Sequence, residues 1–251
     1  MHTSTYRRRL GAVDGHRLGA CMAANVPSRP GYATSTEELR SLSVFITDTC
    51  DVADSIALPH LTIFWIGTEV DLGPLFKRLT LPSLLNLNVF CANLEPPIPQ
   101  ISVTDCIARS GSQLRAAIFK SLRLSNHDLI ALLRLSPSLR LLEISNDDEA
   151  LTGEILGLLT AGDSPCLCPN LEIIRFLESS LSSADGVLAD MVASRQSECP
   201  AAFPAAPLTR FVVQFSDAEF LLHTEDIRRL KNLESDHPKG FRVWINEPET
   251  E

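Results

Sequence analysis

The residues best suited to metal chemistry are two thiols, Cys166 and Cys168, which are separated by a single Leu. A structural zinc site needs four Cys or His ligands, which usually come as two such pairs. No second pair lies close in the sequence, and the six His residues form no H-E-x-x-H pattern. We therefore favour two small thiols that pack in a turn before Pro169 over a zinc site.

Signatures of nucleophilic catalysis and of nucleotide binding do not occur in the sequence. A nucleophile needs a base held by a third group, and there is no G-x-S-x-G elbow and no glycine-rich phosphate loop. The acidic run at 146–149 (NDDE) lacks the alternating ligands of a calcium loop, so we interpret it as the solvated start of a helix. We expect no enzyme activity, no metal and no cofactor.

The composition is that of an ordinary folded protein with an excess of acidic residues. The 251 residues include 22 Lys+Arg and 31 Asp+Glu, a formal net charge of −9, and 45% of them are hydrophobic. Phosphate contacts need clustered Lys and Arg, so this balance argues against binding of nucleic acid or of an anionic membrane.

Membrane and secretion signals are also missing from the sequence. The longest apolar run, Leu61 to Gly67, is far shorter than the roughly 20 residues that span a bilayer. The seven Cys are odd in number and scattered, which favours a reducing compartment. We expect a cytoplasmic or nuclear location.

A phrase of the form Leu-x-x-φ-x-φ, with φ aliphatic or Phe, recurs through the sequence. Its copies begin at Leu39, Leu61, Leu84, Leu114, Leu139, Leu171 and Leu208. Their spacing averages about 28 residues, near the upper end for leucine-rich repeats. The period of two predicts one short strand per copy, with the φ side chains buried on one side. In four copies a Pro stands two residues before the first Leu, where it ends a preceding helix.

Segments with helical spacing lie between the predicted strands, at 71–79, 128–135, 151–160, 184–194 and 219–233. Asn126 is the expected N-cap of the second of these helices. The alternation predicts an α/β leucine-rich-repeat solenoid of about seven irregular repeats, with parallel strands on the concave side and helices on the convex side. We place the solenoid at 37–215 and a C-terminal helix and strand cap at 216–251, with its strand at Gly240–Ile245.

Three segments lack this periodicity. Residues 1–36 form a basic head that we expect to be disordered, and its Arg7–Arg9 run leaves a targeting signal and a solvated tail as alternatives. The proline-rich stretches Glu95–Pro99 and Glu198–Pro207 are predicted loops.

The strand x positions form the remaining candidate site, because repeat proteins bind other macromolecules on such a face. An apolar row of Ile63, Ile118, Leu141 and Ile173 beside Trp65 has the makeup of a protein-binding patch. The alternative is that long insertions fold over this face and bury it. The residues that we predict to contact a protein partner are Ile63, Trp65, Asn88, Ile118, Lys120, Leu141, Glu143, Arg175, Arg210 and Gln214.

Four stretches carry a resemblance that extends beyond the repeat residues: LTLPSLLNLNV (79–89), SNHDLIALLRLSPSLRLLEIS (125–145), LTGEILGLLTAGDSPCLCPNLEIIRF (151–176) and LADMVASRQS (188–197). Together they resemble the leucine-rich C-terminal region of F-box proteins from mushroom-type (basidiomycete) fungi. The resemblance covers about residues 39–215. It implies a non-enzymatic module that holds protein substrates for a cullin (SCF-type) ubiquitin ligase.

The F-box itself has no counterpart in the sequence. In that family it opens with an L-P-x-E-[IL]-L-x-x-I phrase and docks on the Skp adaptor, and residues 1–36 contain no such phrase. A truncated gene model, a shortened paralogue and an F-box protein whose first exon was missed remain as alternatives. We expect a monomer with a protein client on its concave face, and with a Skp-type adaptor and a cullin as further candidate partners. The alternative function is a free-standing leucine-rich-repeat scaffold without ligase contact.

Overall fold

The structure, a computed structural model, describes residues 39–47, 54–92, 103–122, 124–145, 151–162, 166–178, 180–196, 205–237 and 240–246. Its strands are β1 (Ser41–Ile46), β2 (Ile56–Ala57), β3 (Ile63–Thr68), β4 (Leu79–Thr80), β5 (Asn86–Cys91), β6 (Ala116–Lys120), β7 (Leu141–Ser145), β8 (Leu151–Thr152), β9 (Ile173–Leu177), β10 (Leu181–Ser182), β11 (Arg210–Gln214) and β12 (Arg242–Ile245). Its helices are α2 (Gly73–Phe76), α3 (Val103–Ser110), α4 (Asn126–Leu135), α5 (Gly153–Leu159), α6 (Val187–Gln196), α7 (Asp217–Leu222) and α8 (Thr224–Asp236).

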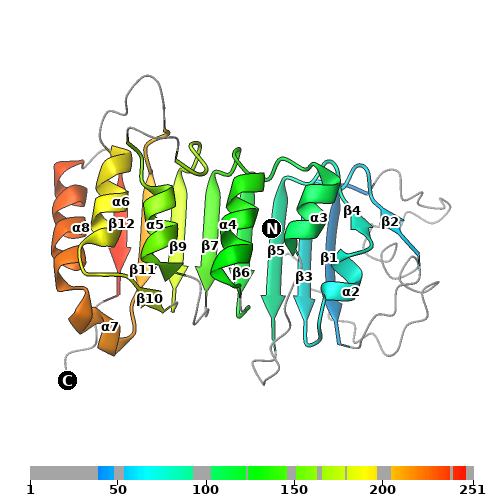
Figure 1. The fold of residues 1–251 in the computed structure, drawn as a ribbon, viewed down its shortest axis with the longest axis horizontal. Helices are drawn as coiled ribbons and strands as arrows, with labels where there is room; N and C mark the ends of the chain where they lie inside the picture. Colours follow the sequence, from blue (N-terminus) through cyan, green and yellow to red (C-terminus); the bar gives the residue numbers. More distant parts are fainter. Residues whose placement is uncertain are drawn as a thin grey trace, which may run out of the picture.

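Eight of these strands form one parallel sheet, in the order β1-β3-β5-β6-β7-β9-β11-β12, which is also their order along the chain. Figure 1 shows the strands in one layer, with helices α3 to α6 and α8 in front of it. Two short parallel pairs, β2 with β4 and β8 with β10, join neighbouring connections outside this sheet. The prediction of an α/β protein with parallel strands and flanking helices is confirmed.

The repeated phrase coincides with strands of the large sheet. In each copy the first Leu lies just before a strand, and the two later φ residues lie on it. In the second copy, Leu61, Phe64 and Ile66 are all at most 2% exposed. Among all the φ residues, Val44 alone is not fully buried, and it packs against the same core. The prediction that each copy is a strand with one buried side is therefore confirmed.

Proline forms the same turn before four of these strands. At Pro59 the N–H of Leu61 donates to the carbonyl of Leu58 at 3.3 Å, which is the closing bond of a β-turn with Pro at its second position. Equivalent bonds close the turns at Pro82, Pro137 and Pro169. Because Pro holds φ at about −65°, each turn delivers its strand to the sheet in a similar direction.

Several helix boundaries differ from the sequence prediction. Ser125, not Asn126, is the N-cap of α4, because its Oγ accepts from the N–H of Asp128 at 3.1 Å. The single helix expected over 219–233 is two helices, α7 and α8, which meet at His223. Helix α2 is shorter than predicted, residues 151–152 are a strand, and α3 was not predicted.

Two arginines hold helix ends from a neighbouring connection. Arg195 on α6 is fully buried and donates to the carbonyls of Leu159 at 2.7 Å and Leu167 at 2.9 Å. Arg109 on α3 donates in the same manner to the carbonyls of Phe76 and Leu79. A guanidinium has five N–H donors, so one side chain satisfies several carbonyls that a helix end leaves open.

The C-terminal strand extends the sheet. It covers Arg242–Ile245 and pairs with β11, so the strand predicted at Gly240–Ile245 is confirmed. Four predictions fall outside the described residues: those on the head 1–36, on Glu95–Pro99, on the acidic run at 146–149 and on most of Glu198–Pro207. Within the described ranges, no helix combines the length and the apolar character needed to cross a membrane.

Candidate functional site

The face of the large sheet that points away from the helices, termed the outer face, carries three rows of side chains. The rows arise because alternate residues of a strand share a face and the strands are in register. The middle row is Ser43, Trp65, Asn88, Ile118, Glu143, Arg175, Val212 and Trp244. The first row is Ser41, Ile63, Asn86, Ala116, Leu141, Ile173, Arg210 and Arg242, and the third is Phe45, Gly67, Phe90, Lys120, Ser145, Leu177 and Gln214.

Both tryptophans of the chain lie in the middle row, Trp65 on β3 and Trp244 on β12. They are 51% and 52% exposed. Phe45 and Phe90 in the third row are exposed as well. The ring of Phe45 lies against Gly67, where a methyl group would overlap it, so the glycine makes room for the ring. Exposed aromatic side chains of this size are concentrated in protein–protein contacts.

Glu143 on β7 is a buried carboxylate at the centre of the middle row. Its side chain is 3% exposed, and its oxygens accept from Lys120 Nζ at 2.7 Å and from Arg175 Nη1 at 3.0 Å. A buried carboxylate without partners is unstable, so the cations of β6 and β9 hold it in place. Since two cations share one anion, the cluster carries a net positive charge. The Lys120 and Arg175 side chains stay 41% and 33% exposed.

All ten residues predicted to contact a partner lie on the outer face. The predicted apolar row is divided, however. Ile63, Leu141 and Ile173 lie in the first row, whereas Ile118 lies in the middle row with Trp65. The sequence pattern thus placed these residues on one face of the sheet, but the row of each residue follows from the register between strands.

The exposure of the other predicted residues varies. Arg210 is exposed, whereas Asn88 is only 8% exposed and has little surface for direct contact. Gln214 is half-buried and donates to Glu178 Oε1 at 3.3 Å. The cationic and aromatic side chains therefore supply most of the exposed groups that a partner can contact on this face.

Sequence reasoning missed four residues of this face: Phe45, Phe90, Arg242 and Trp244. Phe45 and Phe90 each follow the last φ of a copy directly, so extending the phrase by one position would have found them. Trp244 was placed on a predicted strand, but nothing in the sequence indicated its register against β11. Its alignment with the row of Trp65 is a property of the assembled sheet.

The chain was compared with family models, with curated proteins and with solved structures, and it matches none of them. Its function is therefore inferred from its own residues and their geometry.

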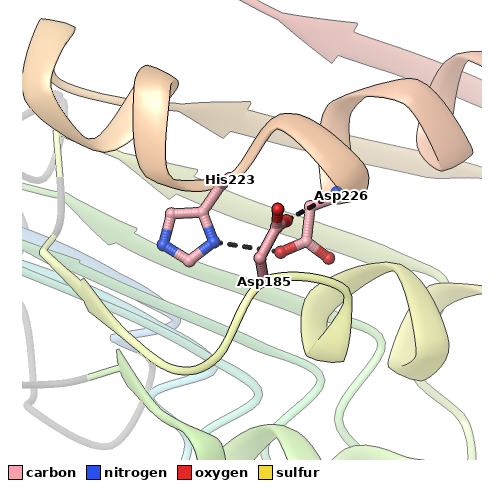
Figure 2. A group of neighbouring side chains, drawn as sticks. All are labelled: Asp185, His223 and Asp226. Carbon is pink, nitrogen blue, oxygen red and sulfur yellow. Dashed lines mark hydrogen bonds and ion pairs between the residues drawn. The ribbon is translucent and has the colours of Figure 1, made fainter.

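A second cluster of ionisable side chains joins α6 and α8 (Figure 2). Asp185, just before α6, accepts from the backbone N–H groups of Glu225 and Asp226 at 3.0 and 2.9 Å. Asp226, in the first turn of α8, accepts from the N–H of Ala189 at 2.7 Å. Each carboxylate thus caps the first turn of the other helix, where backbone N–H groups have no partner within the helix.

His223 completes this cluster from the junction of α7 and α8. Its Nδ1 lies 3.0 Å from Oδ2 of Asp226, and its ring stacks on Phe215 with centroids 5.4 Å apart. Burial alone raises the pKa of Asp185. The N–H groups of Asp226 and Glu225, the charge of His223 and the N–H of Gly186 outweigh this effect, so the pKa of Asp185 lies below its usual value.

Asp185, His223 and Asp226 are also of the types that hold a divalent metal, and their ligand atoms lie within 4.8 Å of one another. In the structure these carboxylates accept three backbone hydrogen bonds. The geometry fits two interlocked helix caps better than a metal site.

The two thiols considered for zinc have different partners: Cys168 contacts backbone carbonyls, whereas Cys166 Sγ accepts from Arg195 Nη2 at 3.7 Å. Cys168 is buried, and its Sγ donates to the carbonyls of Leu133 and Ser136 at 3.5 and 3.4 Å. Burial raises the pKa of Cys168 to about 12 and outweighs the opposing charge of Arg195. A thiol that stays protonated is a poor nucleophile and a poor metal ligand, so this geometry fits the packed turn.

Proposed function

We propose that this protein is a non-enzymatic protein-recognition module, built as an irregular leucine-rich-repeat solenoid whose concave side is the outer face. Seven copies of one phrase on successive parallel strands, together with recurrent proline turns, support this architecture. In this proposal the outer face holds a protein partner, and no bond in the partner is made or broken.

The observation that carries the proposal is the position of the two tryptophans. Trp is among the residues that most often dominate binding energy in protein interfaces. A single exposed aromatic residue needs no explanation. Here both Trp and two Phe share the outer face of the sheet, and each is at least 36% exposed. The helices named above lie on the other side of the sheet (Figure 1).

The resemblance to F-box proteins narrows the proposal to the client-binding region of a cullin ubiquitin ligase adaptor, acting in the cytoplasm or nucleus. The stretches that carry the resemblance contain α4 with β7 and α5 with β9, and a proline turn precedes each of these strands. The free-standing scaffold is the alternative, and it differs only in having no ligase contact.

Site-specific crosslinking in cells that make the protein tests the outer face. A photo-crosslinking phenylalanine analogue replaces Trp65 in one variant and Trp244 in another. Both positions should give covalent adducts with the same discrete protein, because both lie in one row.

Leu135 on α4 provides the matched control position. It is also apolar and 36% exposed, but it lies on the helix side of the sheet. The same analogue at 135 should not give this adduct. Equal adduct yields at 135, or no adduct from 65 and 244 in folded protein, would contradict the proposal.

Co-purification separately tests the proposed contact with a ubiquitin ligase. The tagged full chain and a variant without residues 1–36 are each expressed with a fungal Skp adaptor and a cullin. Stoichiometric adaptor that only the full chain retains supports the ligase adaptor. Crosslinks at 65 without adaptor on either variant support the free-standing scaffold instead.

A further inference from the structure

The two halves of the outer face differ in charge. On β1, β3 and β5, termed the aromatic half, no outward position is charged, and Phe45, Trp65 and Phe90 lie there. On β6, β7, β9, β11 and β12, termed the basic half, the charged outward positions are four cations and one anion: Lys120, Arg175, Arg210, Arg242 and Glu143. The basic half thus has a net outward charge of +3, although the whole chain has a net charge of −9.

Neighbouring charges do not cancel this excess within the described residues. The residues that directly precede or follow the strands of the basic half add two Arg and two Glu, which balance each other: Arg115, Arg140, Glu172 and Glu178. Arg242 is 69% exposed, and its ion pair with Glu234 is long at 3.9 Å. Lys120 and Arg175 share Glu143 and have further N–H donors available.

We propose that the outer face binds an extended acidic protein segment, with an aliphatic or aromatic anchor on the aromatic half and carboxylates on the basic half. This inference rests on the proposed function and names the chemistry of its partner. Charge complementarity favours an acidic segment as the partner, because guanidinium groups bind carboxylates through paired hydrogen bonds. It also accounts for cations at exposed strand positions in an acidic protein.

The sheet geometry sets the spacing between anchor and acids. Trp65 on β3 and Arg175 on β9 lie in one row, four strand steps apart in the sheet order. At about 4.8 Å per step this is about 19 Å. An extended chain covers about 3.3 Å per residue, so about six residues separate the anchor from the first acid that reaches Arg175.

Synthetic peptides test this chemistry on the full-length protein by fluorescence anisotropy. The probe carries one Leu, a Gly-Ser spacer of about six residues and an alternating Glu-Asp tail. We expect saturable binding that weakens as salt is added. Replacing the tail by Gln and Asn should weaken binding at least tenfold, and shortening the spacer to two residues should weaken it several-fold. Equal affinity for the acidic and the amide peptide would overturn the inference.

Two charge-reversal variants distinguish an effect of the outer face on binding from an effect of the overall charge of the chain. Arg210→Glu changes an exposed residue of the basic half and should weaken binding of the acidic probe at least fivefold. Arg134→Glu makes the same change at an exposed position of α4 on the helix side, and binding should stay within twofold. Both variants should keep the circular dichroism spectrum of the parent. Equal losses in the two variants would show an effect of net charge alone and overturn the inference.

The results also distinguish this inference from the proposed function. Crosslinks at 65 and 244 without binding of the acidic probe would leave the protein-binding face standing and overturn only the acidic partner. If neither crosslinks nor probe binding occur, both proposals fail. A single-stranded DNA oligonucleotide that binds more tightly than the acidic peptide and displaces it would assign the basic half to nucleic acid and overturn the inference.

Discussion

Glu143 and Asp226 are both buried carboxylates, with side chains 3% and 0% exposed, but their surroundings differ. Asp226 lies between α6 and α8 and binds a backbone N–H and the ring of His223. Glu143 lies on the outer face, and its ion-pair partners among the described residues are the tips of two long cationic side chains that remain partly in water.

This difference separates a structural cluster from the surface that we propose for recognition. At Asp226 the partners are the backbone N–H of Ala189 and the buried ring of His223, so little can rearrange without breaking a helix start. At Glu143 the partners are flexible side chains with further donors, which can turn toward water or toward a bound carboxylate. We therefore expect the first cluster to contribute to stability and the second to contribute to binding.

Asp226→Ala should give the largest loss of stability. The free energy of unfolding should fall by about 2–3 kcal/mol, because the N–H of Ala189 loses its acceptor and His223 its partner. Urea denaturation measures the loss. Asp236→Ala, at an exposed position of the same helix, is the control and should change stability by less than about 0.5 kcal/mol. A similarly small effect of Asp226→Ala would show that the caps contribute little.

Glu143→Gln should cost less, about 1 kcal/mol, because Lys120 and Arg175 can turn to water when the charge is removed. It also makes the outer face more positive. Binding of the acidic probe should therefore strengthen by about two- to threefold. A loss of stability as large as that of Asp226→Ala would remove the contrast between the two clusters.

Trp65→Ala and Arg175→Ala should weaken partner binding at least tenfold while changing stability little. Both side chains have exposed surface, and Glu143 keeps Lys120 as a partner when Arg175 is lost. The thermal midpoint should move by no more than about 2 °C. Calorimetry and the crosslinking assay measure the two effects. A large drop of the midpoint would identify these residues as part of the core.

Asp185→Asn should have the smallest effect, confined to acidic solution. Since folding lowers the pKa of Asp185, its ionised form stabilises the protein above the unfolded pKa of about 4, and this contribution is lost as pH falls through the folded value. The variant should therefore lose less stability than the parent between about pH 5 and pH 2. Urea denaturation across this range measures the slope, and identical slopes would contradict the role of Asp185 as a helix cap.

Features set by neighbouring residues were predicted well. The alternation in each Leu-x-x-φ-x-φ phrase requires only that adjacent side chains point to opposite faces, so the strands and their buried residues followed from the sequence. The helical spacing before Leu135 likewise predicted α4. The cap of α4 was misplaced by one residue because Ser125 and Asn126 are both good capping residues, and the backbone conformation decides between them.

Features that join distant segments were not predicted. The break between α7 and α8 occurs at His223, where Asp185 from another connection caps the second helix. The burial of Arg195 depends on carbonyls of α5 and of the turn after it. No local pattern encodes such partners, since any of several carboxylates or arginines in the sequence could have filled these positions.

The sequence by itself determined the strands, their buried sides and the face on which the predicted contact residues lie, because these depend on periodicities of a few residues. Only the tertiary structure decided that Trp65 and Trp244 share one row and that Lys120 from β6 and Arg175 from β9 meet at Glu143 on β7. The register between strands depends on how all the φ side chains pack together, and that sum of contacts cannot be read from any single repeat.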